Sequence, residues 1–360
     1  MKLKNGLRVL WRSQNEIQIG EDPRLARTFQ IQHPREFDVL RLLETDRTPA
    51  QLRRELASRG GRRERVDQLL AELRDADLIC PQVRGRTAEM QVPPASRDLL
   101  AAEAESRALV EHDGWKTLAR RTNQRVAIHG LGRTGAQIVM ALAAGGVGLL
   151  LLHDSQPVRA RDRGQVYGQD SVGQPRSEVL AEIVKERGFE CEVRYRGRSS
   201  RPDAAVLVDY EVADPTRAAY LTSQGINHLS VVISELGITC GPWVPRGSGP
   251  CLRCQRLWEA QQDPCWPRLA TQRAVASGVA RRGEDPSLAA VMSGLAAAQV
   301  LQGLAGEVPS TAGRLATMTL PSYQLKWDDL RVHPECHSHV PPPRRTVSWN
   351  PPPIMPLPPS

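Results

Sequence analysis

A glycine-rich turn between an apolar run and a helix-like segment is the part of this chain best suited to chemistry. Residues 126–135 read as a short strand that turns tightly into a helix, with glycines at positions 130, 132 and 135. Gly130 permits the sharp turn, Gly132 lets the backbone approach a phosphate without a Cβ, and Gly135 lets the helix pack closely on the strand. Because the N–H groups of a helix N-terminus attract anions, the spacing predicts a phosphate site that includes Arg133.

An acid follows at the distance that a nucleotide site needs. The apolar run 149–153 ends at Asp154, twenty-four residues after Gly130, where a ribose-binding carboxylate belongs. The plain alternative is a glycine-rich turn that binds nothing. A nicotinamide-dependent dehydrogenase would share the turn and the acid, but we find no residues that could serve hydride transfer. The placement of Asp154 favours a nucleotide.

Cysteine and histidine residues form a second candidate site, separate from the glycine turn in the sequence. A C-x-x-C pair follows a Gly/Pro loop, and a C-x-x-H pair lies within residues 333–339. Zn²⁺ prefers four nitrogen or sulfur ligands, and a closed set of four is structural rather than catalytic. The predicted ligands are Cys251, Cys254, Cys336 and His339. His337 or His333 can replace His339, and a redox pair or simple buried thiols are the alternatives.

The composition limits the classes of partner. With 360 residues, 40% of them hydrophobic, the chain can form a large α/β domain and a smaller one. The net charge of +8 is spread through segments of mixed sign, without a basic run interleaved with aromatic residues. This pattern argues against a nucleic-acid partner.

The chain also lacks the features of an exported or membrane protein. No apolar signal segment follows Met1, and the apolar stretch 288–305 is interrupted by Ser293, Gln299 and Gln302. We therefore expect a buried helix rather than a membrane span, and a cytoplasmic protein.

The N-terminal region has the pattern of a small separate module. Residues 7–12 and 16–19 alternate as a hairpin, and three amphipathic helices follow, the second opened by a capping box at Thr48. This predicts a winged-helix-like α+β module over residues 1–82. The third helix carries too many acids to lie against DNA phosphates, so peptide binding is the better interpretation.

The remaining chain divides into three predicted parts. A helical connector covers residues 83–123, a nucleotide-binding domain covers 124–340, and a Pro-rich disordered tail covers 341–360. The domain is predicted to be an α/β fold, a Rossmann-like doubly wound parallel sheet with structural zinc knuckles. The expected strands are 126–130, 149–153, 191–195, 205–209 and 228–233, and the expected helices include 134–145 and 175–187.

From about residue 120 to 339 the chain resembles the ThiF/MoeB adenylyltransferases, relatives of ubiquitin-activating enzymes. The resemblance depends on the order of several motifs. They are the glycine turn, the strand ending at Asp154, Arg163, the segment 172–178, the strand ending at Asp209, and the two zinc knuckles.

The resemblance implies an activity and a set of roles. In such a protein Gly130 and Gly132 hold ATP, Asp154 binds the ribose, and Arg163 and Arg176 serve catalysis at the phosphates. Asp209 or Asp214 would carry Mg²⁺. A carboxylate of a peptide or small carrier protein would then attack the α-phosphorus and form an acyl-adenylate. Members are commonly homodimers, which we expect here too.

Departures from the family pattern point to a second hypothesis. The usual lysine is Arg176, the second acid after Asp154 is Gln156, and no cysteine takes the place of a thioester nucleophile. These changes resemble an actinobacterial branch in which a PqqD-like module presents a leader peptide to a YcaO-type enzyme. The alternative to an adenylyltransferase is therefore a catalytically degenerate, leader-peptide-binding scaffold.

Overall fold

A computed structural model describes residues 1–80, 87–111, 113–196, 200–246, 249–276 and 284–338. The predicted Pro-rich tail and His339 lie outside these residues. The chain divides into two compact units, Met1–Ala119 and Arg120–Ser360.

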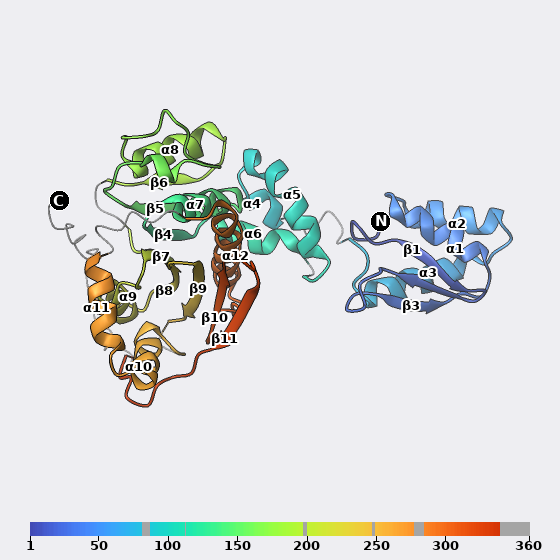
Figure 1. The fold of residues 1–360 in the computed structure, drawn as a ribbon. Helices are drawn as coiled ribbons and strands as arrows, with labels where there is room; N and C mark the ends of the chain where they lie inside the picture. Colours follow the sequence, from blue (N-terminus) through green and yellow to red (C-terminus); the bar gives the residue numbers. More distant parts are fainter. Residues whose placement is uncertain (81–86, 112, 197–199, 247–248, 277–283, 339–360) are drawn as a thin grey trace. The chain divides into compact units, whose positions relative to one another are not determined.

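The N-terminal unit contains a three-stranded antiparallel sheet with the order β1-β2-β3 (Figure 1). The strands are β1 (Val9–Ser13), β2 (Glu16–Ile19) and β3 (Arg27–Gln30). The pairing of β1 with β2 confirms the predicted hairpin. Strand β3 was missed because all but one of its four residues are exposed, so no apolar alternation marks it.

Three helices follow the sheet as the periodicity predicts. They are α1 (Arg35–Arg41), continued by the short η1 (Leu42–Glu44), then α2 (Pro49–Ser58) and α3 (Arg63–Asp75). The capping box is confirmed, because Thr48 Oγ1 accepts the Gln51 N–H at 3.2 Å and Gln51 Oε1 accepts the Thr48 N–H at 2.8 Å. Leu and Val side chains from the three main helices pack with Ile17 and Ile19 in one core.

A second group of helices follows, and the last of them continues two residues past the end of this unit. They are α4 (Thr87–Gln91), α5 (Pro94–Ala108) and α6 (Gly114–Arg121). Their small core consists of Val92, Leu100, Ala104, Leu118 and Ala119. Residues of the predicted connector are therefore ordered helices with a core of their own.

The second unit is built on an eight-stranded sheet with the order β11-β10-β9-β8-β7-β4-β5-β6. Its parallel strands are β4 (Arg125–His129), β5 (Leu149–His153), β6 (Glu192–Arg194), β7 (Ala204–Tyr210) and β8 (Asn227–Ile233). These five match the five predicted strands. They place the ends of β4, β5 and β7 at one edge of the sheet, where α/β folds bind ligands.

The sheet is mixed, which corrects the prediction of a parallel sheet. Strands β9 (Gly237–Val244), β10 (Arg314–Thr319) and β11 (Leu325–Asp329) extend the sheet in antiparallel register. Strand β9 carries Gly241 and Pro242, residues that are rare inside strands, and nearly all of it is buried, so neither composition nor alternation indicated a strand.

Helices cover both faces of this sheet. One face packs against α7 (Arg133–Ala144), α8 (Arg176–Glu186) and α12 (Pro286–Ala305). The other packs against α9 (Pro215–Ser223) and α10 (Leu252–Gln262), which is followed by α11 (Trp266–Ala276). Helices α7 and α8 match the two predicted helical segments to within a residue at each end.

Helix α12 is the apolar stretch of the sequence. By length and composition it could cross a membrane, but half of its most apolar window is buried within the protein. Met292, Ala296 and Val300 pack in the main core, and α12 contacts α7 and β9. These contacts make α12 a core helix of the α/β unit.

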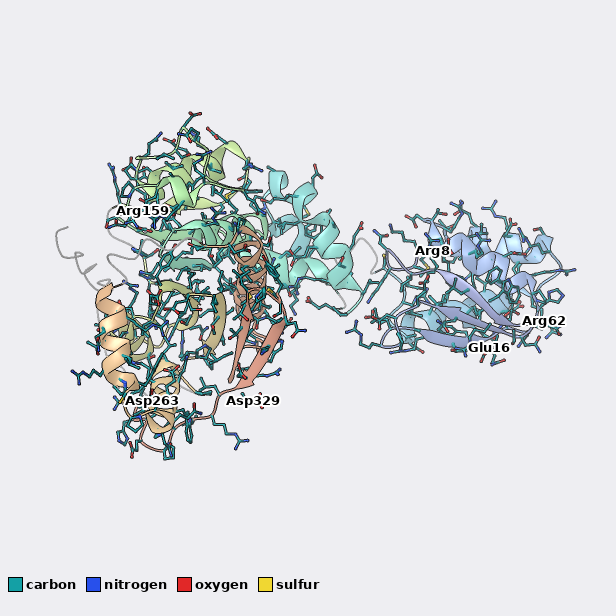
Figure 2. The ribbon with its side chains drawn as sticks, viewed as in Figure 1. Arg8, Glu16, Arg62, Arg159, Asp263 and Asp329 are labelled. Carbon is teal, nitrogen blue, oxygen red and sulfur yellow. The ribbon has the colours of Figure 1, made fainter. Side chains whose placement is uncertain are left out.

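Charged side chains of both signs cover the outside of each unit. Figure 2 shows the exposed residues Arg62, Asp263 and Asp329 among them. This agrees with the mixed-sign charge pattern of the sequence rather than with one basic face.

Substituting Gly135 tests the packing of α7 on the glycine turn. An alanine Cβ there would lie 2.0 Å from the Gly130 carbonyl oxygen, a backbone atom that cannot move aside. We expect Gly135→Ala to lower the free energy of unfolding by at least about 3 kcal/mol, measured by urea denaturation. Gly294→Ala is the control, because a Cβ at this exposed position of α12 meets nothing within 4 Å. It should raise stability by about 0.5–1 kcal/mol, and equal effects of the two changes would contradict the prediction.

Candidate functional site

The glycine turn connects β4 to α7 at the carboxyl edge of the sheet. Gly130 has a φ of +87°, and a Cβ there would lie 2.2 Å from the Val208 carbonyl oxygen. Only glycine therefore fits this position, as the spacing predicted. Gly132 is the N-cap of α7, and no side chain of its own caps the helix.

Asp154 holds this turn against the neighbouring strand. One carboxylate oxygen accepts the Leu131 N–H at 2.7 Å, and the other accepts the Gln156 N–H at 2.8 Å. The side chain is only 8% exposed. Both oxygens are thus occupied by the protein, and the ribose contact of Asp154 stays a prediction.

Arg176 lies buried between two carboxylates. It donates to Asp154 at 2.9 Å and, through two nitrogens, to Asp162 at 3.1 and 2.7 Å. Burial opposes the charge of Arg176, but the two acids outweigh it and raise the pKa of the guanidinium. Because Asp162 was not singled out from the sequence, the ion pairs of Arg176 with two carboxylates of the protein were not predicted. Its contact with a phosphate remains a prediction.

Two other arginines are better placed to meet an anion. Arg163 is exposed, and within the described residues its side chain has no hydrogen bond or ion pair. Arg133, the first residue of α7, donates to the Arg161 carbonyl at 2.7 Å, while its buried Nε has no hydrogen-bond partner among the residues that the structure describes. Its Nη1 would lie 3.5 Å from a Cβ at Gly164, so the two arginines belong to adjoining segments.

A carboxylate that sequence reasoning missed lies at the N-terminus of α7. Glu284 accepts the Thr134 N–H at 2.9 Å and also the Thr134 hydroxyl, and its other oxygen accepts the Tyr210 hydroxyl. Burial and the neighbouring Glu284 raise the pKa of Tyr210 well above 10, so Tyr210 remains a neutral donor. No periodicity or spacing connects residue 284 to residue 134, so the contact could not be predicted.

Asp209 and Asp214 lie together, but not with the glycine turn. Val208 and Tyr210 face the turn, and alternation along β7 places Asp209 on the opposite face of the sheet. Asp209 accepts the Asp214 N–H at 3.0 Å, and Arg217 lies 3.5 Å from Asp209 and 3.3 Å from Asp214. The predicted Mg²⁺ role would require these contacts to change.

A stacked histidine pair borders the same face. The rings of His129 and His153, at the ends of β4 and β5, lie 4.5 Å apart and nearly parallel. Burial lowers the pKa of His153 to about 4 and that of His129 well below 6.5. Both rings are therefore neutral near pH 7.

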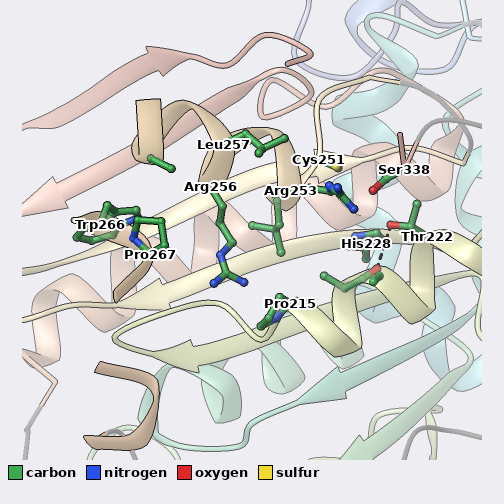
Figure 3. A pocket seen from close by; sticks show the side chains of 14 residues that line it. Pro215, Thr222, His228, Cys251, Arg253, Arg256, Leu257, Trp266, Pro267 and Ser338 are labelled. Atoms are coloured by element: carbon green, nitrogen blue, oxygen red, sulfur yellow. Dashed lines mark hydrogen bonds between the residues drawn. The ribbon is translucent and has the colours of Figure 1, made fainter. Parts of the chain in front are cut away.

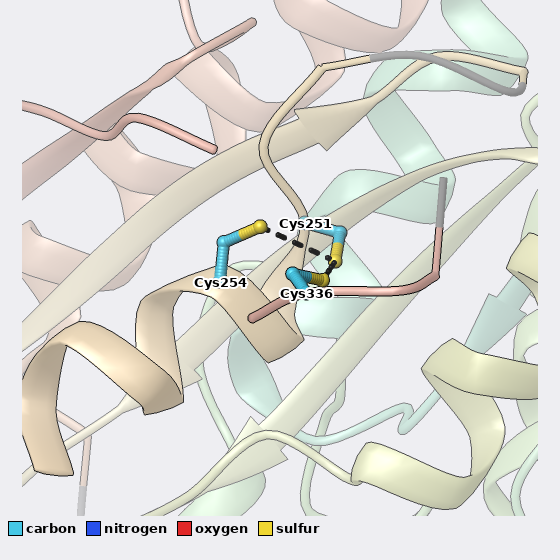
Figure 4. Close-up of side chains that lie close together, drawn as sticks. All are labelled: Cys251, Cys254 and Cys336. Atoms are coloured by element: carbon cyan, nitrogen blue, oxygen red, sulfur yellow. Dashed lines mark hydrogen bonds between the residues drawn. The ribbon is translucent and has the colours of Figure 1, made fainter. Parts of the chain in front are cut away.

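Three cysteine sulfurs meet at the start of α10. Cys251 Sγ lies 3.9 Å from Cys254 Sγ and 3.7 Å from Cys336 Sγ, although 85 positions separate the last pair (Figure 4). All three are buried and close enough to share one metal ion. His333 is not in the group, because its Nε2 contacts Gln261 at 3.3 Å. The structure thus brings together three of the four predicted ligands.

A mainly apolar cavity of about 380 Å³ lies between α9, α10 and α11 (Figure 3). Arg253, Arg256, Trp266 and the buried His228 are among its lining residues. His228 is at the amino end of β8, whereas the glycine turn follows the carboxyl end of β4. This cavity is therefore separate from the glycine turn.

The family model for ThiF matches residues 104–339, about two thirds of the chain. The chain belongs to the ThiF family. The SAMP-activating enzyme E1 of Haloferax volcanii is 30% identical over 180 residues, an alignment that spans 45% of this chain and 64% of that relative.

Two solved structures have the same fold as this ThiF-family chain. PaaA superimposes with a TM-score of 0.70 at 16% identity, covering 90% of this chain and 98% of PaaA. Escherichia coli MccB with AMPCPP and MccA gives 0.68 at 13% identity, covering 93% and 98%. Because Arg120–Ser360 is about two thirds of the chain, this coverage includes most of the N-terminal unit.

Asp209, whose side chain is 14% exposed, makes stability depend on pH. Burial raises the pKa of its carboxyl from 3.8 to about 6, so the folded state favours the protonated form. The contribution to stability is therefore full below about pH 4 and is lost as the pH rises through about 6. Asp209→Asn stays neutral, and should be more stable than the native chain above pH 6 by up to about 3 kcal/mol. Urea unfolding from pH 4 to 8 measures this, and parallel curves for the two proteins would contradict it.

Proposed function

We propose that this ThiF-family protein is an ATP-dependent adenylyltransferase that activates the carboxylate of a peptide or small carrier protein. The observation that carries the proposal is the glycine turn. It presents the N-terminus of α7, which no side chain of Gly132 caps, at the carboxyl edge of the sheet, with Arg133 and Arg163 beside it. Solved MccB complexes with ATP and with MccA support it, because MccB shares the fold of both units.

The reaction would depend chiefly on electrostatics. The substrate carboxylate attacks the α-phosphorus, the bond to the pyrophosphate breaks, and an acyl-adenylate forms. Negative charge accumulates on the phosphate oxygens in this step, so α7 N–H groups, Arg133 and Arg163 would stabilise it. Mg²⁺ bound with ATP would neutralise part of the same charge. Asp154 and Arg176 would keep the turn and the following loop in place for this contact.

The N-terminal unit is proposed to bind the peptide. Its edge strands β1 and β3 each leave one side unpaired within the described sheet, and an extended peptide can add a strand to such an edge. The SAMP-activating relative supports a small protein as the alternative substrate. A PqqD-like role for residues 1–82 belongs to this proposal.

A second candidate is the leader-peptide-binding scaffold that works with a YcaO-type enzyme. The observation that favours it is that the charged side chains at the turn already contact other groups of the protein. Glu284 occupies the N-terminus of α7, and Arg176 is neutralised by Asp154 and Asp162. In a scaffold the glycine turn would be a structural part only and would bind no nucleotide.

We also propose that the cysteine cluster holds a structural Zn²⁺. Three cysteine sulfurs within 4.8 Å of one another suit tetrahedral zinc, and His339 or His337 would supply the fourth ligand. The ion would join the segment at Cys336 to α10 and would take no part in the reaction.

Nucleotide binding separates the two candidate functions. With Mg-ATP at a hundred times its dissociation constant, an adenylyltransferase should be stabilised by about 2.7 kcal/mol, measured as a shift in thermal unfolding. Arg163→Ala should lower ATP–pyrophosphate exchange at least about tenfold, because it removes a cation from the developing charge. Arg187→Ala, which removes an exposed cation from the end of α8, is the control. No thermal shift and no exchange with candidate peptides would leave the scaffold.

Zinc is tested by metal analysis of the purified protein. We expect about one zinc per chain, and Cys254→Ser should lose it and unfold at least about 5 °C lower. Cys265→Ser is the matched control, since Cys265 is exposed and lies outside the cluster. A native protein that folds fully in the presence of a chelator, without zinc and at the same Tm, would contradict the proposal.

A further inference from the structure

The N-terminus of α7 already holds an anion that belongs to the chain itself. The backbone N–H of Thr134 points at the Glu284 carboxylate at 2.9 Å, and the Thr134 hydroxyl donates to the same oxygen. The Tyr210 hydroxyl donates to the other oxygen. Glu284 is 8% exposed. A carboxylate with three donors at a helix N-terminus uses the same interactions that bind a phosphate there.

The position of Gly132 supports the same conclusion independently. In a glycine turn of this kind the second glycine leaves room for the backbone to approach a phosphate. Here a Cβ built on Gly132 would lie 2.7 Å from the Tyr210 hydroxyl and 3.1 Å from Glu284 Oε1. The space that the missing Cβ leaves is therefore filled by these two side chains.

We propose that Glu284 is a resident competitor of the nucleotide: its carboxylate occupies the phosphate position of the free protein and must leave before ATP binds. The inference rests on the proposed nucleotide site at this turn. A phosphate and the carboxylate cannot share the Thr134 N–H, and two anions at this distance repel each other. The apparent affinity for ATP is therefore the affinity of the open site multiplied by the fraction of molecules in which Glu284 has left Thr134.

The competition also regulates the site. Any partner that draws Glu284 away from Thr134 raises the affinity for ATP without touching the nucleotide, and ATP in turn favours that partner. Because Asp285, the next residue, caps α12 through the Ser287 and Leu288 N–H groups, the backbone beside Glu284 is fixed at a helix end. The competitor is thus held near the turn at a high local concentration.

Two variants test the proposal on the full-length protein. Glu284→Gln keeps the size of the side chain but removes its charge, and it should bind Mg-ATP at least tenfold more tightly in isothermal titration calorimetry. Tyr210→Phe removes one donor to Glu284 and leaves the turn intact, so it should tighten binding a few-fold. Glu186→Gln, at the exposed end of α8, is the charge-matched control and should bind like the native protein.

Inorganic pyrophosphate is the second probe, because it needs only the phosphate position. It should raise the unfolding temperature of the Glu284→Gln protein and leave that of the native protein nearly unchanged. Equal or weaker ATP binding by Glu284→Gln would overturn the competition and leave the proposed nucleotide site standing. If neither ATP nor pyrophosphate binds the native protein or a folded Glu284→Gln variant, the proposed function fails and the inference fails with it.

Discussion

The hydrogen bonds of the Asp154 carboxylate are the constraint on which the rest of the site depends. One oxygen accepts the Leu131 N–H inside the glycine turn and also the Arg176 guanidinium. That guanidinium in turn holds Asp162, which fixes the loop before Arg163. These groups are buried, so leaving any one of them without its partner would cost far more than an exposed ion pair contributes. The turn, β5 and the arginine loop therefore behave as one rigid part.

The contacts within this rigid part show that a charged residue in a motif is not always free to bind a ligand. Spacing predicted that Asp154 binds a ribose, and the family resemblance implied that Arg176 contacts a phosphate. In the structure they bind each other, whereas Arg163 keeps an exposed side chain. An anion that approaches the turn consequently meets the helix N–H groups and the outer arginines, and it competes there with Glu284.

The sequence indicated those elements whose residues carry a local pattern. Apolar runs marked β4 and β5, glycine spacing marked the turn, and the capping box at Thr48 marked α2. Strand β9 was not predicted because it is buried on both faces, which removes the alternation of apolar and polar residues. Strand β3 was not predicted because it is mostly exposed, which removes the same alternation. The contact of Glu284 with Thr134 spans 150 positions, and only the folded sheet brings the two together. Long-range contacts between polar residues leave no periodicity to detect.

The meeting of Cys336 with Cys251 has a consequence for the order in which the protein can fold during synthesis. The two sulfurs lie 3.7 Å apart across 85 positions, and between them the chain forms α12 and the antiparallel strands β10 and β11. The parallel half of the sheet, from β4 to β8, is complete in the nascent chain well before Cys336 is made. The buried cysteine cluster can close only after Cys336 has been synthesised. A protein truncated before residue 336 would keep the residues of the glycine turn but would leave Cys251 and Cys254 without the third sulfur.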